Sequence, residues 1–306
     1  MVSSGPLQFL IITYSLSSKG IGGLLRGGRM IDAHQHFWSL SRGDYSWPND
    51  SVEPIFRDFC PDDLSPLLQR AGVSRTILVQ ATDTVAETEW LLELPRTFPA
   101  VAGVVGWVDL SAPDAIVMID RLRADPLLKG LRPMLQNIQE TDWILRPEVA
   151  PSLAHMERVG LRFDALIQPR HLPSILALAG RYPDLPIVID HLAKPRMGAG
   201  ITPDDAWANG MRTLAARPNV WCKLSGMITE IGPGWQPEDL APFAALVLDA
   251  FGPSRCMFGS DWPVVTLAGS YQGWMDMAQT LTARFSAAEK ERVFATSAAE
   301  FYGLEK

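Results

Sequence analysis

The chain has 306 residues, of which 47% are hydrophobic and 20% are charged, and its formal net charge is −7. This composition supports a large buried core and excludes an intrinsically disordered chain. The negative charge, without any run of Lys and Arg, disfavours nucleic acid or an anionic membrane surface as a partner. The three cysteines, Cys60, Cys222 and Cys256, show no CxxC spacing. They predict reduced thiols and therefore a cytoplasmic protein.

Residues 1–29 differ from the rest of the chain. An apolar stretch at residues 7–16 precedes a Ser- and Gly-rich run, and the stretch is too short to span a bilayer. The first residues carry no positive side chain, which disfavours a secretory signal. We predict that residues 1–29 are a poorly ordered or non-native extension and that residues 30–306 form a single domain.

From Met30 onward, short apolar runs rich in β-branched residues alternate with segments of helical period. Strands that alternate with helices indicate parallel strands joined by crossovers. In chain order, the predicted strands lie within residues 30–36, 76–81, 102–110, 128–136, 162–169, 186–195, 219–227 and 256–263, and the clearest helical spacings lie at residues 64–71, 175–179, 207–214 and 243–250.

Two architectures fit this alternation, an open doubly wound sheet and a closed barrel. The first predicted strand ends in His-Gln-His-Phe-Trp and lacks the Gly-rich turn of nucleotide-binding folds. Eight strand–helix units are also the number that closes a barrel. We therefore predict a single (β/α)8 TIM-type barrel, whose active site would lie at the carboxyl ends of the strands.

The first and last predicted strands carry the clearest candidates for chemistry. His34 and His36 are two residues apart and share one face of a strand, as does Asp32. Asp261 ends the eighth run, and a closed barrel makes the eighth strand a neighbour of the first. Hydrogen-bonded core histidines and a helix-capping aspartate are the structural alternatives. A carboxylate beside two imidazoles favours a functional site.

The sixth run ends in Asp190 and His191, which face opposite ways along a regular strand. We choose His191 as the inward residue, because Ile187 and Ile189 share its parity and would fill the layers below it. The alternative places Asp190 inward.

Further polar and aromatic residues follow the predicted strands and are candidates for substrate binding. A guanidinium group can clamp a carboxylate, and a carboxamide can bind hydroxyl groups. Lys223 and Ser225 share one face of the seventh run, and one of them could reach the mouth of the barrel. His155 is interpreted as structural or solvent-facing, and His171 starts a loop from which it could approach the site. The candidate substrate-binding residues are Arg132, Gln168, Lys194, Trp38, Trp107 and Trp262.

In this order, the motifs IDAHQHFW, LKGLRP, IDHLAKP, KLSG and GSDWPV resemble the second amidohydrolase-related family. Within it, the chain is most similar to the lactonase branch, which includes fuconolactonase, rhamnonolactonase and pyrone-dicarboxylate lactonase. The resemblance covers Met30 to Leu304. It implies catalytic roles for the residues at the ends of strands 1, 6 and 8, namely His34, His36, His191 and Asp261.

The resemblance also exposes two departures. The wider superfamily usually places another histidine on strand 5 and a metal-supporting lysine or glutamate on strand 4. This sequence offers Gln168 and Arg132 there, which argues against a two-metal site. We expect catalysis without a metal. The alternative is a single zinc or manganese ion bound by His34, His36 and Asp261.

The resemblance implies hydrolysis of a small lactone, and we expect a sugar-acid lactone as the substrate. Asp261 would take a proton from water, and the three histidines would polarise the carbonyl group. The small-molecule lactone is the expected partner. The alternatives are metal-dependent decarboxylation of an aromatic acid, isomerisation of a lactone, and a non-catalytic barrel that binds a ligand.

Overall fold

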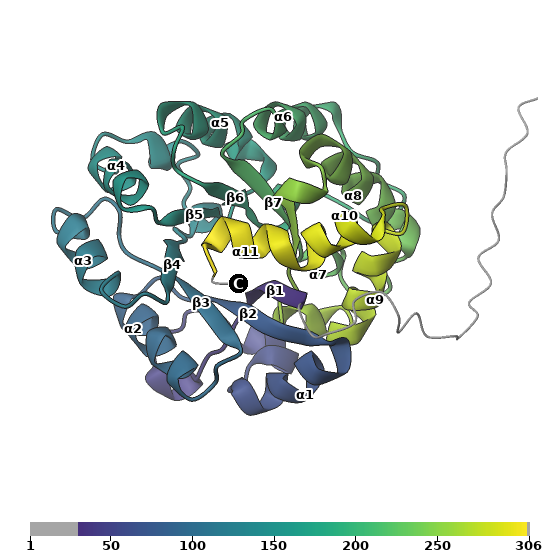
Figure 1. Ribbon diagram of the computed structural model, residues 1–306, viewed down its shortest axis with the longest axis horizontal. Coiled ribbons are helices and arrows are strands. Elements are labelled where there is room, and N and C mark those ends of the chain that lie inside the picture. The colour runs from purple at the N-terminus through teal and green to yellow at the C-terminus, as the bar shows by residue number, and fades with distance from the viewer. Residues whose placement is uncertain (1–29, 305–306) are drawn as a thin grey trace, which may run out of the picture.

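The computed structural model describes residues 30–304, so the predicted extension at residues 1–29 lies outside the described part. Eight parallel strands form one sheet in the order β1 to β8, and helices surround them (Figure 1). Each predicted run contains or overlaps one strand, and the predicted (β/α)8 barrel is confirmed. The strands are β1 (Met30–Gln35), β2 (Val73–Val79), β3 (Val101–Gly106), β4 (Leu128–Leu131), β5 (Arg162–Ala165), β6 (Ile187–Ile189), β7 (Val220–Leu224) and β8 (Cys256–Phe258).

The helices form the outer ring, and the four predicted helical segments fall within α1, α5, α6 and α8. In α1, Leu64 and Leu68 are buried against the sheet, and Gly72 ends the helix in a left-handed conformation. The helices are α1 (Pro61–Ala71), α2 (Val85–Glu93), α3 (Ala115–Leu122), α4 (Ala150–Val159), α5 (Leu172–Arg181), α6 (Asp205–Ala215), α7 (Met227–Ile231), α8 (Pro237–Phe251), α9 (Tyr271–Leu281), α10 (Ala287–Glu291) and α11 (Ser297–Tyr302).

The barrel closes just beyond the end of β8. Gln35 and Trp262 form a parallel bridge, and the Asp261 N–H donates to the His34 carbonyl at 2.8 Å. Gly259 allows this close approach, because a Cβ atom there would lie 2.7 Å from the Cβ of His34. The sequence thus brings the end of the eighth unit directly against the first strand.

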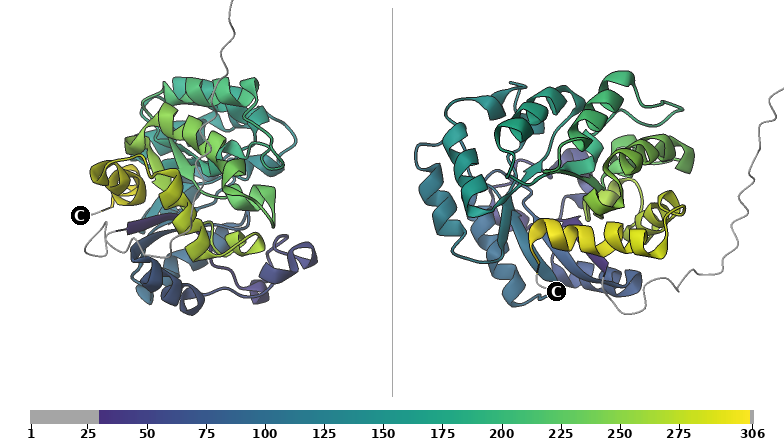
Figure 2. Two further views of the ribbon diagram at one scale, coloured as in Figure 1. Left: turned by 90° about the vertical axis from the view of Figure 1, so that its right-hand side faces the viewer. Right: turned by 45° about the horizontal axis from the view of Figure 1, so that its top comes forward.

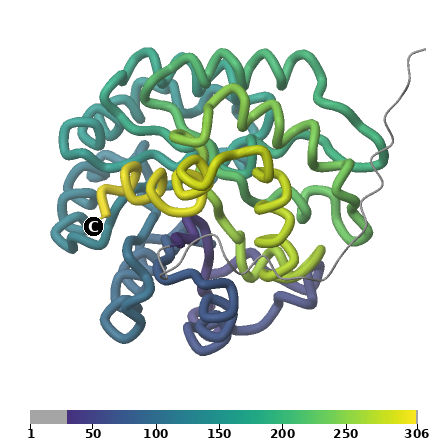
Figure 3. Tube along the Cα trace, turned by 45° about the vertical axis from the view of Figure 1, so that its right-hand side comes forward, coloured from purple at the N-terminus to yellow at the C-terminus, as the bar shows by residue number. Residues whose placement is uncertain are grey.

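An apolar layer fills the barrel near the amino ends of the strands. Helix α11 lies across this end of the barrel (Figures 1 and 3), and the side view in Figure 2 shows it outside the sheet. Arg162, the first residue of β5, donates from Nε to the Phe301 carbonyl at 2.6 Å. This apolar layer consists of Ile31, Ala33, Ile77, Val79, Val105, Val188, Trp221 and Met257, with Phe301 and Tyr302 from α11.

Within residues 30–304, no helix has the length and apolar character that crossing a bilayer requires.

Candidate active site

Three imidazoles and one carboxylate meet at the carboxyl ends of the strands. The Nε2 atoms of His34, His36 and His191 lie 3.7, 3.4 and 3.9 Å from the same oxygen, Oδ1 of Asp261. All four residues are buried. The closure between β8 and β1 creates this arrangement, because it places Asp261 beside residues that precede it by more than 200 positions.

The backbone at Asp261 has a φ of 58°, which is unusual for a residue other than glycine. Hydrogen bonds hold this turn: Asp32 accepts from the Ser260 N–H at 2.8 Å and from the Tyr271 hydroxyl at 3.0 Å. Asp32 therefore supports the turn from the side of α9, although the sequence predicted that it would share a face with His34. Between Asp32 and Gln35, β1 advances by three residues while its partner β2 advances by two. This register shift breaks the alternation of side chains between the two faces of β1.

Asp190 and His191 both reach the site, contrary to the prediction that only one could. Strand β6 ends at Ile189, and a turn of four left-handed residues, from His191 to Lys194, follows. Val188 belongs to the apolar layer inside the barrel, whereas Ile187 and Ile189 pack on the helix side. Asp190 thus continues the inward face of the strand, and the turn brings His191 in beside it.

The imidazoles are held through their second ring nitrogens. Nδ1 of His36 lies 2.7 Å from the Val79 carbonyl oxygen, and Nδ1 of His191 lies 2.8 Å from Oγ of Ser225. A Cβ atom at Gly226 would lie 2.5 Å from Nδ1 of His191, so the close packing requires glycine. These contacts orient each Nε2 toward Asp261.

Burial and neighbouring charges set the protonation of the site. Burial lowers the pKa of His191 to about 4, and Asp261 only partly offsets this. Burial raises the pKa of Asp261, but His191, His36 and His34 outweigh that effect and hold the pKa well below its usual value. At neutral pH, His191 is therefore a neutral imidazole and Asp261 is a carboxylate.

A charged layer lies between the site and the apolar layer; it consists of Arg132, Asp164, Asp190 and Lys223. Asp190 lies 3.4 Å from Nδ1 of His34 and 3.4 Å from Nη1 of Arg132. Lys223 lies 3.0 Å from Asp190 and 2.5 Å from Asp164. Sequence reasoning did not include Asp164. The signal was available, since a charged residue between Phe163 and Ala165 interrupts an otherwise apolar strand.

The structure places the polar substrate-binding candidates in different surroundings. Arg132 is buried and is bonded to the Gln80 carbonyl and Asp190, so its guanidinium supports the site from below. Gln168 is exposed and accepts from Arg170. Lys194 forms an ion pair with Glu230 at 2.8 Å. Strand β5 ends at Ala165, three residues before Gln168, so Gln168 lies beyond the strand, and its role in substrate binding stays a prediction.

The three tryptophan candidates also differ from one another. Trp38 is buried, lies 6.4 Å from His36 between ring centroids, and donates from Nε1 to the Arg57 carbonyl. Trp262 is buried, with its ring centroid 5.3 Å from that of Phe59. Trp107 is half-buried. Of the three tryptophan candidates, Trp38 is therefore the residue whose ring lies beside a histidine of the site.

The two remaining histidines have structural partners. Nε2 of His155 lies 2.9 Å from Asp120, and Nδ1 of His171 accepts from the Gln168 N–H at 3.0 Å. His155 matches the structural interpretation made from the sequence, and His171, which could have approached the site, bonds within the turn that begins at Gln168.

The donor atoms of His34, His191 and Asp261 all lie within 4.8 Å of one another. The sequence-based metal set had His36 in place of His191, and its Nε2 lies 3.2 Å from that of His34. Imidazoles whose Nδ1 atoms are held by other residues, together with a carboxylate, suit zinc or manganese. The residues fit one divalent cation, provided that the proton of His34 is on Nδ1.

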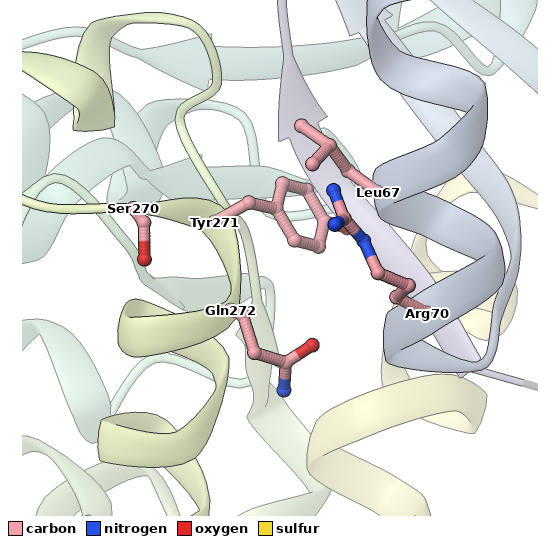
Figure 4. Close-up of a pocket in the computed structure, with 5 residues that line it drawn as sticks. All are labelled: Leu67, Arg70, Ser270, Tyr271 and Gln272. Atoms are coloured by element: carbon pink, nitrogen blue, oxygen red, sulfur yellow. The ribbon is translucent and has the colours of Figure 1, made fainter.

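Two surface pockets lie away from this cluster. One pocket of about 260 Å³ lies between α1 and the start of α9, where Leu67 and Arg70 face Tyr271 (Figure 4). A second, of about 510 Å³, lies between α5 and α6. None of the four site residues lines either pocket.

A (β/α)8 barrel with imidazoles at the ends of strands 1 and 6 and an aspartate after strand 8 has the arrangement of an enzyme active site. The comparison with known families identifies the class more closely. A family model described as amidohydrolase matches residues 31–304, and the chain belongs to this family.

Curated relatives cover nearly the whole chain. An L-fucono-1,5-lactonase of Burkholderia ambifaria is 46% identical over 280 residues, which are 90% of this chain and 96% of that protein. An L-fucono-1,5-lactonase of Burkholderia multivorans is 36% identical over 91% of this chain and 97% of that protein. A crystal structure of a Burkholderia multivorans amidohydrolase with bound zinc is 35% identical, covers 90% of this chain and 100% of that chain, and has a TM-score of 0.84.

Proposed function

We propose that this protein hydrolyses a sugar-acid lactone, with L-fucono-1,5-lactone as the first candidate substrate. The observation that carries the proposal is the convergence of three imidazole Nε2 atoms on the buried carboxylate of Asp261. Two relatives that match nearly the whole chain are named for this activity, which supports the choice of substrate.

The chemistry follows from the protonation states. Asp261, a carboxylate at neutral pH, takes a proton from a water molecule whose oxygen attacks the lactone carbonyl carbon. An imidazole N–H donates to the carbonyl oxygen as negative charge develops there. The bond from the carbonyl carbon to the ring oxygen then breaks. The ring oxygen takes the proton from Asp261, and a hydroxy acid is released.

The histidines do not contribute equally. The Val79 carbonyl can only accept a hydrogen bond, so Nδ1 of His36 carries a proton, and when this is the only proton of the ring, Nε2 is an acceptor. His36 can therefore orient the attacking water, whereas His34 and His191 remain as donors to the carbonyl oxygen. The sequence-based expectation that all three histidines donate is revised in this respect.

We propose that the reaction proceeds without a metal, because a lactone is an activated ester and hydrogen bonds suffice to stabilise its oxyanion. If a divalent cation binds, His34, His191 and Asp261 would hold it, and it would supply Lewis-acid polarisation of the carbonyl. The free thiols of Cys222 and Cys256 support a cytoplasmic location.

The test is a panel of aldonolactones assayed by proton release, with and without a chelator. We expect rapid opening of L-fucono-1,5-lactone that persists after chelation, and analysis of the product by NMR should show the open hydroxy acid. Absence of opening across the panel would overturn the proposed reaction. Loss of activity on chelation that zinc restores would overturn metal independence alone.

A further inference from the structure

Lys223 lies inside the barrel on β7 with a completely buried side chain. Its Nζ donates to Oδ2 of Asp164 at 2.5 Å and lies 3.0 Å from Oδ1 of Asp190. A buried ammonium group requires compensation of its charge, and the two carboxylates supply it. As an ammonium group, Lys223 can donate hydrogen bonds but cannot accept them.

The remaining polar contact of Lys223 is with a histidine of the site. Its Nζ lies 3.1 Å from Nδ1 of His34. A ring nitrogen that accepts a hydrogen bond carries no proton, so the single proton of the neutral ring must be on Nε2. The ring is completely buried and faces the ammonium group of Lys223, and both features disfavour a second proton on it.

The other side of the same imidazole gives an independent indication. Nε2 of His34 lies 3.2 Å from Nε2 of His36. Nδ1 of His36 donates to the Val79 carbonyl, so Nε2 of a His36 ring with this single proton holds a lone pair. Two facing ring nitrogens form a hydrogen bond only if one of them carries a proton, and here that nitrogen is Nε2 of His34.

A competing acceptor lies close by. Oδ1 of Asp190 is 3.4 Å from Nδ1 of His34 and 3.0 Å from Nζ of Lys223. A proton on Nδ1 would be donated there and would leave a lone pair on Nε2, which is the form that binds a metal. Nδ1 of His34 thus lies between a donor, Lys223, and an acceptor, Asp190.

We propose that Lys223 is a positioning residue that fixes the proton of His34 on Nε2, which makes His34 the hydrogen-bond donor to the substrate carbonyl oxygen. The same tautomer withholds the Nε2 lone pair from a divalent cation. The role in turnover rests on the proposed lactone hydrolysis, whereas the tautomer of His34 does not depend on it.

The test is nitrogen NMR of the metal-free full chain labelled with 15N-histidine, in which protonated and unprotonated ring nitrogens have distinct signals. The His34 signals are assigned by their loss in His34→Gln. We expect a proton on Nε2 of His34 in the unmodified protein. A proton on Nδ1 would overturn the proposal, and this spectrum decides the matter even if the variants below do not fold.

In Lys223→Met, which keeps the length of the side chain but removes its donors, the proton of His34 should move to Nδ1 and be donated to Asp190. The kcat for lactone opening should fall about 10- to 100-fold with little change in KM. Zinc, titrated alone, should bind more tightly than to the unmodified protein.

Arg132→Met is the matched control. It removes another buried positive charge beside Asp190 without touching His34. In Arg132→Met, we expect the proton of His34 to stay on Nε2. Zinc should therefore bind less tightly to Arg132→Met than to Lys223→Met. Equal tightening of zinc binding in both variants, or an Nε2 proton that persists in Lys223→Met, would overturn the role of Lys223. If His34 shows the expected tautomer but no lactone is opened, the proposed function fails and the tautomer assignment stands.

Discussion

The interior of this barrel has two layers of opposite character. Near the amino ends of the strands, the apolar layer that includes Ile77, Val188 and Met257 packs against Phe301 of α11. Near the carboxyl ends, Asp190, Lys223 and the other members of the charged layer lie beneath the four site residues. The apolar layer stabilises the fold through burial of nonpolar surface. The charged layer costs desolvation energy, and it orients the groups that do the chemistry.

One residue links the two layers. The Tyr302 ring belongs to the apolar layer, and its hydroxyl donates to Oδ2 of Asp164 at 2.7 Å. The C-terminal helix therefore contacts both layers, although it closes the opposite end of the barrel from the site. If the two layers have separate roles, substitutions in the site should lower activity with little effect on stability. Substitutions in the apolar layer should lower stability with little effect on activity.

The largest effect is expected from Asp261→Asn. The carboxamide cannot accept the proton of the attacking water, so kcat should fall by about 10²- to 10⁴-fold while the thermal unfolding temperature changes little. Steady-state turnover and circular dichroism provide the two measurements. Asp249→Asn, at a surface ion pair with Arg284, is the control and should keep full activity. Turnover retained in Asp261→Asn would exclude this residue as the base.

In the apolar layer, Phe301→Ala should show the reverse pattern. Loss of a buried aromatic ring should lower the free energy of unfolding by about 3–5 kcal/mol, with kcat of the folded enzyme unchanged. Urea unfolding followed by tryptophan fluorescence measures the first quantity. Val117→Ala, at a 72% exposed position, is the control. If kcat of Phe301→Ala fell as far as kcat of Asp261→Asn, the apolar layer would contribute to catalysis, and the proposed division of roles would be wrong.

The pH dependence of stability should sharpen the comparison, because the apolar layer does not titrate. Burial lowers the pKa of His191 to about 4 in the folded protein, so the unfolded chain binds more protons between about pH 6.5 and pH 4. The contribution of His191 should therefore destabilise the protein by about 3 kcal/mol as the pH falls through this range.

His191→Asn removes this group, so its unfolding free energy should fall less over the same range. Denaturant unfolding of both proteins at pH 7, 5.5 and 4.5 measures the difference. Parallel pH curves for the two proteins would contradict the neutral state assigned to His191.

The smallest effect is expected from Gln168→Ala. The side chain is exposed and bonded to Arg170, so the unfolding free energy should change by less than about 0.5 kcal/mol and kcat/KM should stay the same. The comparison is with Arg132→Met, which disturbs the charged layer. A rise in KM in Gln168→Ala would restore its sequence-based role in substrate binding.

The alternation of apolar runs and helical spacings was sufficient to predict the closed barrel, because hydrophobic periodicity is local and repeats in each unit. The same alternation failed at three places. It assigned Asp32 to the face of His34, favoured His191 over Asp190 as the inward residue, and extended β5 to Gln168. In the first case an irregular register breaks the period of two, and in the other two the strand ends earlier than its apolar run.

The sequence by itself determined the eight units, their order, and the types of residue at the ends of strands 1, 6 and 8, since these depend on local pattern and on the neighbourhood that closure imposes. Only the tertiary structure decided which nitrogen of each imidazole faces Asp261 and which groups surround Lys223. Those contacts join β1, β5, β6 and β7 through side chains. The left-handed turn that begins at His191 and the close approach at Gly259 set their geometry, and no local periodicity encodes either feature.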